Sequence, residues 1–156
     1  MHTDAYLLQE RYIRDMNIRK AKSSDAKEIS GLMSELGYSI SAEALLVKLT
    51  EFAQRNYDQV FVAESNGNIR GCISCHITSL FHQPGSSGRI TSLVVAEASR
   101  GKGIGQLLVE TAEDFFRANG CIKSEVTSGE QRHAAHQFYL SCGFSLDERR
   151  FIKLYN

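Results

Sequence analysis

A short stretch in the second half of the sequence, SRGKGIGQ, combines three glycines with two cationic side chains. A run rich in β-branched residues precedes it, and apolar residues at helical spacing follow it. The first N–H groups of a helix have no partner inside the helix, and the helix dipole places about half a positive charge at that end. Glycine lets an anion approach the backbone, and arginine or lysine adds donors beside it. The stretch therefore predicts a pyrophosphate site formed by Arg100, Gly101, Lys102, Gly103 and Gly105.

Two common nucleotide-binding patterns do not fit this spacing. The phosphate loop of nucleoside triphosphatases needs GxxxxGK followed by Ser or Thr, which the stretch lacks. The dinucleotide pattern GxGxxG needs a third glycine. That position holds Gln106 when counted from Gly101 and Leu108 when counted from Gly103.

The pattern R-x-x-G-x-G does fit, at Arg100, Gly103 and Gly105. Through it the sequence resembles the GNAT superfamily of N-acetyltransferases. The strand before the loop, the last helix with the turn after it, and the turn after the first helix also resemble that family; these segments read SLVV, RHAAHQFYLSCGF and LGYSIS. The resemblance implies that the loop holds acetyl-coenzyme A and that the acetyl group is transferred to an amine.

The resemblance also implies which residues contact acetyl-coenzyme A. Main-chain groups of the strand, the loop and the last helix are expected to contribute, with a main-chain N–H near Val94 facing the thioester oxygen. The expected cofactor-binding residues are Leu93, Val94, Val95, Arg100, Gly101, Lys102, Gly103, Ile104, Gly105, Gln106, Arg132, Ala135 and Phe138. Arg132 departs from the family, in which asparagine often stands there, and it is expected either to reach the phosphates or to lie on the surface.

Acetyl transfer to an amine needs a proton donor for the departing thiolate and a way to neutralise the amine. By resemblance, Tyr139 is the expected donor. A tyrosine has an ordinary pKa of about 10, which exceeds that of a thiol at about 8.5.

The base is less clearly marked, because many relatives carry a glutamate on the fourth strand and RITSLVV contains no carboxylate. Glu125, on the following strand, is the predicted catalytic base, acting through water. His76, His82 and a water-mediated route with no single base are the alternatives. Tyr38, Phe81 and His82 are expected to bind the acceptor, whose identity the sequence does not give.

The hydrophobic pattern predicts one α/β (α+β) domain with the element order β-α-α-β-β-β-α-β-α-β. Its resemblance implies a GNAT-type, mixed and mostly antiparallel central sheet flanked by helices. The segment RRFIKLY is expected to form the final strand. Residues 1–15 are predicted as an N-terminal extension that can be flexible, and residues 16–156 as a single acetyltransferase domain.

Composition excludes several other classes of function. Lysine plus arginine and aspartate plus glutamate both number 18, so no net charge favours nucleic acid or an anionic membrane. No apolar run is long enough to cross a bilayer, and the N-terminus lacks the features of a secretory signal. The four cysteines are therefore expected as free thiols in a cytoplasmic protein, and the C-x-x-C pair should place its thiols on opposite faces of a strand. No metal site is predicted.

The predicted function is acetyl-coenzyme A-dependent N-acetyl transfer to a primary amine of a small molecule or protein, by direct transfer in a ternary complex. A covalent route is disfavoured because Cys121 and Cys142 lack an evident base partner. The alternative from another class is a non-catalytic domain that binds acyl-coenzyme A as a sensor. The resemblance allows a homodimer, which the sequence does not decide.

Overall fold

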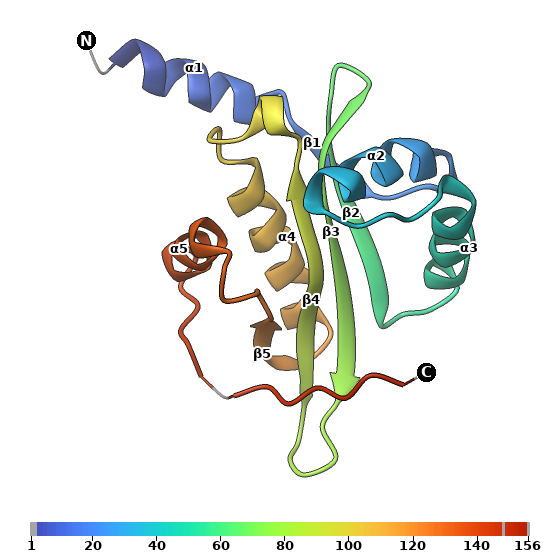
Figure 1. The fold of residues 1–156 in the computed structure, drawn as a ribbon. Coiled ribbons are helices and arrows are strands. Elements are labelled where there is room, and N and C mark those ends of the chain that lie inside the picture. The colour runs from blue at the N-terminus through green and yellow to red at the C-terminus, as the bar shows by residue number, and fades with distance from the viewer. Residues whose placement is uncertain (1–2, 148, 156) are drawn as a thin grey trace.

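The described residues of this computed structural model, 3–147 and 149–155, are built around one five-stranded sheet (Figure 1). The strands follow the order β1-β2-β3-β4-β5, and all neighbours pair antiparallel except β4 and β5, which are parallel. Their bounds are Asn17–Lys20 (β1), Asp58–Ser65 (β2), Asn68–Ser79 (β3), Ser86–Val95 (β4) and Cys121–Val126 (β5). The predicted mixed, mostly antiparallel fold is confirmed.

Helices cover both faces of the sheet, with α2 and α3 on one face and α4 and α5 on the other (Figure 1). Ser41 caps α3 through a 3.1 Å bond from the Ala44 N–H to its hydroxyl. The helices and the two 3-10 segments have these bounds: Thr3–Arg14 (α1), Ser23–Asp25 (η1), Ala26–Leu36 (α2), Ala42–Ala53 (α3), Glu97–Ser99 (η2), Ile104–Ala118 (α4) and His133–Ser141 (α5).

Each face of the sheet has its own apolar core. The core beside α4 contains Ile73 and Phe116, and the core beneath α2 and α3 contains Leu49. The C-x-x-C pair shows the division, because Cys75 lies in the first core and Cys72 in the second. The prediction that these free thiols point to opposite faces is confirmed.

Strand β4 has two halves with different neighbours. Its last pair with β5 joins Ile90 to Val126, whereas its pairing with β3 continues to Val95. Beyond Ile90, the β5-facing edge of β4 therefore has no strand partner among the described residues. Main-chain N–H and C=O groups along such an edge are available to another extended molecule.

A β-bulge lies where the two halves of β4 meet. Ser74 of β3 pairs with Ser92, and the next residue, Cys75, pairs with Ile90. Thr91 is therefore the extra residue on β4. A bulge bends its strand and redirects the side chains next to it, and here Thr91 and Ser92 both lie within hydrogen-bond distance of Ser74.

The prediction of a final strand over RRFIKLY is wrong, because residues 149–155 form neither strand nor helix. Their apolar side chains are in solvent, with Phe151 93% and Tyr155 89% exposed. The segment has the apolar composition of a strand, but a strand forms only where a neighbouring strand accepts its main-chain hydrogen bonds. The three cationic residues Arg149, Arg150 and Lys153 also favour water.

Most of the predicted N-terminal extension forms helix α1, whose C-terminal end borders the glycine stretch. The Tyr12 hydroxyl donates to the Ser99 hydroxyl at 3.4 Å, and the Lys102 ammonium lies 4.6 Å from the centroid of the Tyr12 ring. A Cβ at Gly103 would lie 3.4 Å from Ile13. The extension therefore contributes to the surroundings of the predicted anion site.

Candidate active site

The glycine stretch forms the turn between η2 and α4, as predicted. Gly101 and Gly103 have φ values of 76° and 90°, a region that favours glycine. Gly103 is the N-cap residue of α4. It has no side chain to accept a hydrogen bond from the first N–H groups of the helix, so these groups point into the turn without a capping acceptor. A Cβ at Gly101 would meet no atom within 4 Å. The turn therefore presents main-chain donors on an open surface, the geometry of an anion site.

The two cationic side chains of the stretch each donate to a main-chain carbonyl that precedes the turn. The Arg100 Nε donates to the Val95 carbonyl at 3.0 Å, and its guanidinium lies 3.8 Å from the Glu35 carboxylate. Lys102 donates to the Ala98 carbonyl at 3.5 Å. Half of the Arg100 side chain is exposed, so its remaining N–H groups can reach a bound anion.

Gly105 has a packing role that the sequence pattern does not reveal. A Cβ there would lie 3.2 Å from two atoms of the Phe138 ring, which is tighter than an ordinary contact. The glycine thus allows α4 and α5 to approach each other. The predicted contacts Ile104 and Gln106 lie in the first turn of α4, and Ala135 lies on α5.

The second half of β4 carries the other predicted cofactor contacts. Leu93 and Val95 pack against the core beside α4, and Val94 is buried in the core beneath α2. Their side chains thus pack in the two cores, and the edge of β4 at these residues that faces away from β3 has no strand partner among the described residues.

Tyr139 lies on α5 among aromatic rings, with ring centroids 5.3 Å from Phe138 and 5.7 Å from Phe144. Burial raises the pKa of Tyr139 above its ordinary value, with a smaller contribution from Cys142 and an opposing one from Arg132. The phenol is therefore protonated at neutral pH, as a proton donor must be.

Arg132 is the N-cap residue of α5, and it links the two layers of helices. Its guanidinium donates to the Leu36 carbonyl, at the end of α2, at 3.0 Å. The contact joins an element on one face of the sheet to an element on the other. The sequence left open whether Arg132 reaches the phosphates or lies on the surface. Arg132 is exposed, and a contact with the phosphates stays a prediction.

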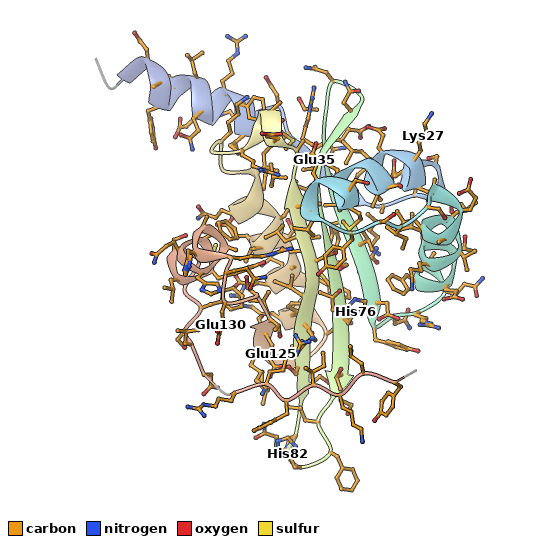
Figure 2. All side chains as sticks on the ribbon, viewed as in Figure 1. Lys27, Glu35, His76, His82, Glu125 and Glu130 are labelled. Atoms are coloured by element: carbon orange, nitrogen blue, oxygen red, sulfur yellow. The ribbon has the colours of Figure 1, made fainter. Side chains whose placement is uncertain are left out.

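The predicted acceptor-binding residues lie in two separate places. Tyr38 follows α2 and is 56% exposed. Phe81 and His82 lie in the loop between β3 and β4, and His82 is at the far tip of this hairpin, well away from His76 (Figure 2). An acceptor role for all three stays a prediction.

Glu125 lies on β5 in a row of charges. It accepts a 2.7 Å contact from the Lys123 ammonium and lies 3.9 Å from the Arg89 guanidinium. The hydrogen bond from Lys123 is the main cause that holds the pKa of Glu125 below its ordinary range, with Ser87 and Arg89 adding smaller effects in the same direction. A carboxylate with a lowered pKa is a weaker proton acceptor.

A second set of polar side chains, which we call the polar row, joins three strands on the face of α2 and α3. The carboxylate of Asp58, which is buried, lies 2.7 Å from His76 Nδ1, and His76 Nε2 lies 2.7 Å from the Thr91 hydroxyl. The Ser74 hydroxyl lies 2.7 Å from that of Thr91 and 2.6 Å from that of Ser92. The polar row thus consists of Asp58, His76, Thr91, Ser74 and Ser92.

Sequence reasoning found one member of the polar row, His76, as a candidate base and missed the other four. Single polar residues on strands carry no motif. The available signal is the alternation of Ser74 and His76 on β3, which places both on one face. The cross-strand pairing of His76 with Asp58 then needs the register of β2 and β3.

The described residues contain no cluster of three or more metal-ligating side chains. His133 and His136 are neighbours on α5, but the His136 Nε2 lies 2.8 Å from the Gly129 carbonyl. Among the described helices, none combines the length and apolar character needed to span a bilayer.

Comparison with known proteins places these features in a family. The family model described as "Acetyltransferase (GNAT) family" matches residues 28–144. Over 123 residues the sequence is 31% identical to an uncharacterized N-acetyltransferase of Bacillus subtilis, YhdJ, a match that covers 78% of this chain and 86% of the relative.

Two further similarities concern proteins with stated acceptors. The sequence is 36% identical over 92 residues to an aminoalkylphosphonate N-acetyltransferase of Salmonella typhimurium, covering 59% of this chain and 60% of that relative, which is less than two thirds of its length. The fold matches the crystal structure of glucosamine-6-phosphate N-acetyltransferase from Arabidopsis thaliana with a TM-score of 0.78 and 26% identity, over 90% of this chain and 99% of that one.

Proposed function

Because the chain belongs to the GNAT family of acetyltransferases, in which acetyl-coenzyme A is the acetyl donor, we propose that it acetylates a primary amine of a small molecule. The observation that carries this proposal is the course of β4, which continues from Ile90, its last pair with β5, to Val95 and then leads into the glycine turn. The names of two similar proteins, for aminoalkylphosphonate and glucosamine 6-phosphate acetylation, support a small acceptor bearing a phosphorus-containing acid.

The residues present fit a coenzyme A thioester. A pyrophosphate needs N–H donors and cations, which the start of α4 offers together with Arg100 and Lys102. The edge of β4 from Leu93 to Val95 that faces away from β3 has no strand partner among the described residues, and it suits the amide groups of the pantetheine arm. When bound, the thioester supplies an electrophilic acetyl carbon with sulfur as the leaving group.

Tyr139 is the proposed acid. Its partly buried phenol keeps its proton at neutral pH, and it can give that proton to the sulfur when the carbon–sulfur bond breaks. The base proposed from the sequence, Glu125 acting through water, lies on the sheet beside Arg89, which pairs across the strands with His76. Glu125 and His76 are therefore the two cross-strand neighbours of Arg89. Lys123 stabilises the charge of Glu125, which makes this carboxylate a weaker proton acceptor than an ordinary one.

Direct transfer is proposed over an acyl-cysteine route. Burial raises the pKa of both Cys72 and Cys75 to about 12, and it also raises the pKa of Cys121 and Cys142. Thiols with raised pKa values hold little thiolate at neutral pH and are poor nucleophiles. A homodimer and a cytoplasmic location stay predictions from the sequence.

The proposal is tested by calorimetry with acetyl-coenzyme A, followed by a free-thiol assay with a panel of amines that includes aminoethylphosphonate and glucosamine 6-phosphate. We expect binding, thiol release with at least one amine and an acetylated product in mass spectra. Binding with no thiol release above background would support the non-catalytic sensor instead. An absence of binding would overturn both.

A further inference from the structure

We propose that the polar row is a proton relay that removes the proton from the acceptor amine, an inference that rests on the proposed function. The relay would run from Ser92, at the bulge of β4, to the buried carboxylate of Asp58 on β2. It supplies the base that β4 lacks in its own sequence. It also explains why five polar side chains from three strands are hydrogen-bonded in sequence on one face of the sheet.

The directions of the hydrogen bonds follow from Asp58. An ionised carboxylate only accepts, so His76 Nδ1 carries the proton of that bond and Nε2 has a free lone pair. Nε2 then accepts from the Thr91 hydroxyl. Thr91 in turn accepts from Ser74, and Ser74 accepts from Ser92. The Ser92 oxygen is left with a lone pair for an incoming N–H group.

The end of the relay lies where the acetyl group is expected. Ser92 is the residue before Leu93, at which the main chain assigned to the thioester begins, and it lies two residues past the last pair of β4 with β5. The other end can return to its starting state, because a quarter of the His76 side chain is exposed to water. A proton collected at the bulge can therefore leave through the imidazole.

The side chain of His76 is surrounded by groups from three other elements of the fold. Asp58 of β2 pairs with it directly, and Arg55 occupies the second carboxylate oxygen of Asp58 at 3.1 Å. The Phe52 ring of α3 packs edge-on at 5.5 Å. On β4, Arg89 is opposite His76 in the register, and it is in turn neutralised by Glu125 at 3.9 Å.

The proton balance of the step is complete. As the acceptor nitrogen forms its bond to the acetyl carbon, its proton passes to the Ser92 oxygen. Ser92 gives its own proton to Ser74, Ser74 gives its proton to Thr91, and Thr91 gives its proton to His76 Nε2. The imidazolium is stabilised by Asp58 and releases a proton to water. Tyr139 supplies the proton that the sulfur receives and regains a proton from water. For a neutral acceptor amine, one proton therefore leaves nitrogen, one reaches sulfur, and each protein group returns to its starting state.

Three single variants test the relay. Thr91→Val keeps the shape of the side chain but removes the hydroxyl, and Thr91→Ser restores it. Thr78→Val, on an exposed threonine of β3, is the matched control. With an acceptor identified by the amine panel, we expect Thr91→Val to lower kcat about 100-fold. Its acetyl-coenzyme A affinity and acceptor KM should stay within about threefold, and Thr91→Ser and Thr78→Val should stay near wild type.

A measurement on the free protein tests the hydrogen-bond directions without any turnover. NMR of ¹⁵N-labelled histidine, with the His76→Gln variant identifying the signal, should show His76 with its proton on Nδ1, and Thr91→Val should move the Nε2 resonance. A proton on Nε2 in the neutral ring, or full kcat in Thr91→Val while the wild type is active, would overturn the relay. An inactive wild-type protein with every amine would instead refute the proposed function.

Discussion

The two faces of the sheet carry candidate functional groups that are built in different ways. The face of α4 carries the glycine turn, in which every predicted donor lies between Arg100 and Gln106 of one continuous segment. The face of α2 and α3 carries the polar row, whose members come from β2, β3 and β4. The glycine turn is a candidate ligand site formed by one short segment. The polar row exists only when the three strands are paired in the folded sheet.

The difference has a physical origin. A helix N-terminus has its unpaired N–H groups whatever the rest of the protein does, so a local pattern is enough to produce an anion site. The polar row depends on the register that sets His76 opposite Asp58, and on the bulge that brings Thr91 and Ser92 to the same serine. Moving one strand by one residue would turn its side chains to the other face.

The largest effect is expected from the acid that serves the α4 face. Tyr139→Phe removes the phenol proton but keeps the ring that packs between Phe138 and Phe144. We expect kcat to fall about 100-fold or more, with unchanged unfolding temperature and acetyl-coenzyme A affinity. Since burial raises the Tyr139 pKa, the wild-type kcat should show no alkaline loss from this group below about pH 10. Unchanged turnover in the variant would remove Tyr139 from the mechanism.

The anion site itself can be broken with a matched pair of glycines. Gly101 and Gly120 both have φ of 76° and open space where a Cβ would stand, but only Gly101 lies in the turn. A carboxylate beside a pyrophosphate costs roughly 3 kcal/mol, so Gly101→Asp should weaken acetyl-coenzyme A binding about 100-fold in calorimetry. Gly120→Asp should bind normally, and both should lose about 1–2 kcal/mol of stability from the positive φ.

If Gly101→Asp bound acetyl-coenzyme A as tightly as Gly120→Asp does, the pyrophosphate would lie elsewhere. The ¹⁵N resonances of His76 serve as a check on the opposite face. They should be unaffected in both variants, because none of the hydrogen bonds that join the polar row involves a residue of the turn.

The sequence predicted features that depend on neighbouring residues better than features that several elements of the fold form together. The glycine turn before α4 and the opposed thiols of Cys72 and Cys75 were predictable because each depends on a few neighbouring residues. The packing of Gly105 against Phe138 was not, because it joins two helices. The final strand was predicted wrongly, since a β-like composition at 149–155 does not say whether a neighbouring strand is there to pair with it.

A smaller effect should distinguish what the cationic side chains of the turn contribute to acetyl-coenzyme A binding from what its main-chain N–H groups contribute. Arg100→Ala removes one guanidinium near the expected phosphates, together with its 3.0 Å hydrogen bond to the Val95 carbonyl. A charge-assisted hydrogen bond contributes about 1.5 kcal/mol, so calorimetry should show roughly tenfold weaker acetyl-coenzyme A binding at low salt and a smaller difference at high salt. Arg117→Ala, at the exposed far end of α4, is the control and should change nothing. Equal affinities for the two variants would assign the binding to the main chain alone.

The smallest effect is expected at Glu125. Its size decides whether Glu125 or the polar row removes the proton from the acceptor amine. Lys123 and Arg89 stabilise the carboxylate and lower its pKa, so it attracts a proton weakly at neutral pH. Glu125→Gln should therefore lower kcat less than about fivefold, a fraction of the loss that a general base causes. Asp114→Asn, an exposed carboxylate on α4, is the control. A loss of more than about tenfold in Glu125→Gln, with normal acetyl-coenzyme A binding, would return the base to Glu125 acting through water. The polar row would then be a structural hydrogen-bond network, because a reaction with an effective carboxylate base has no need of a second path for the same proton.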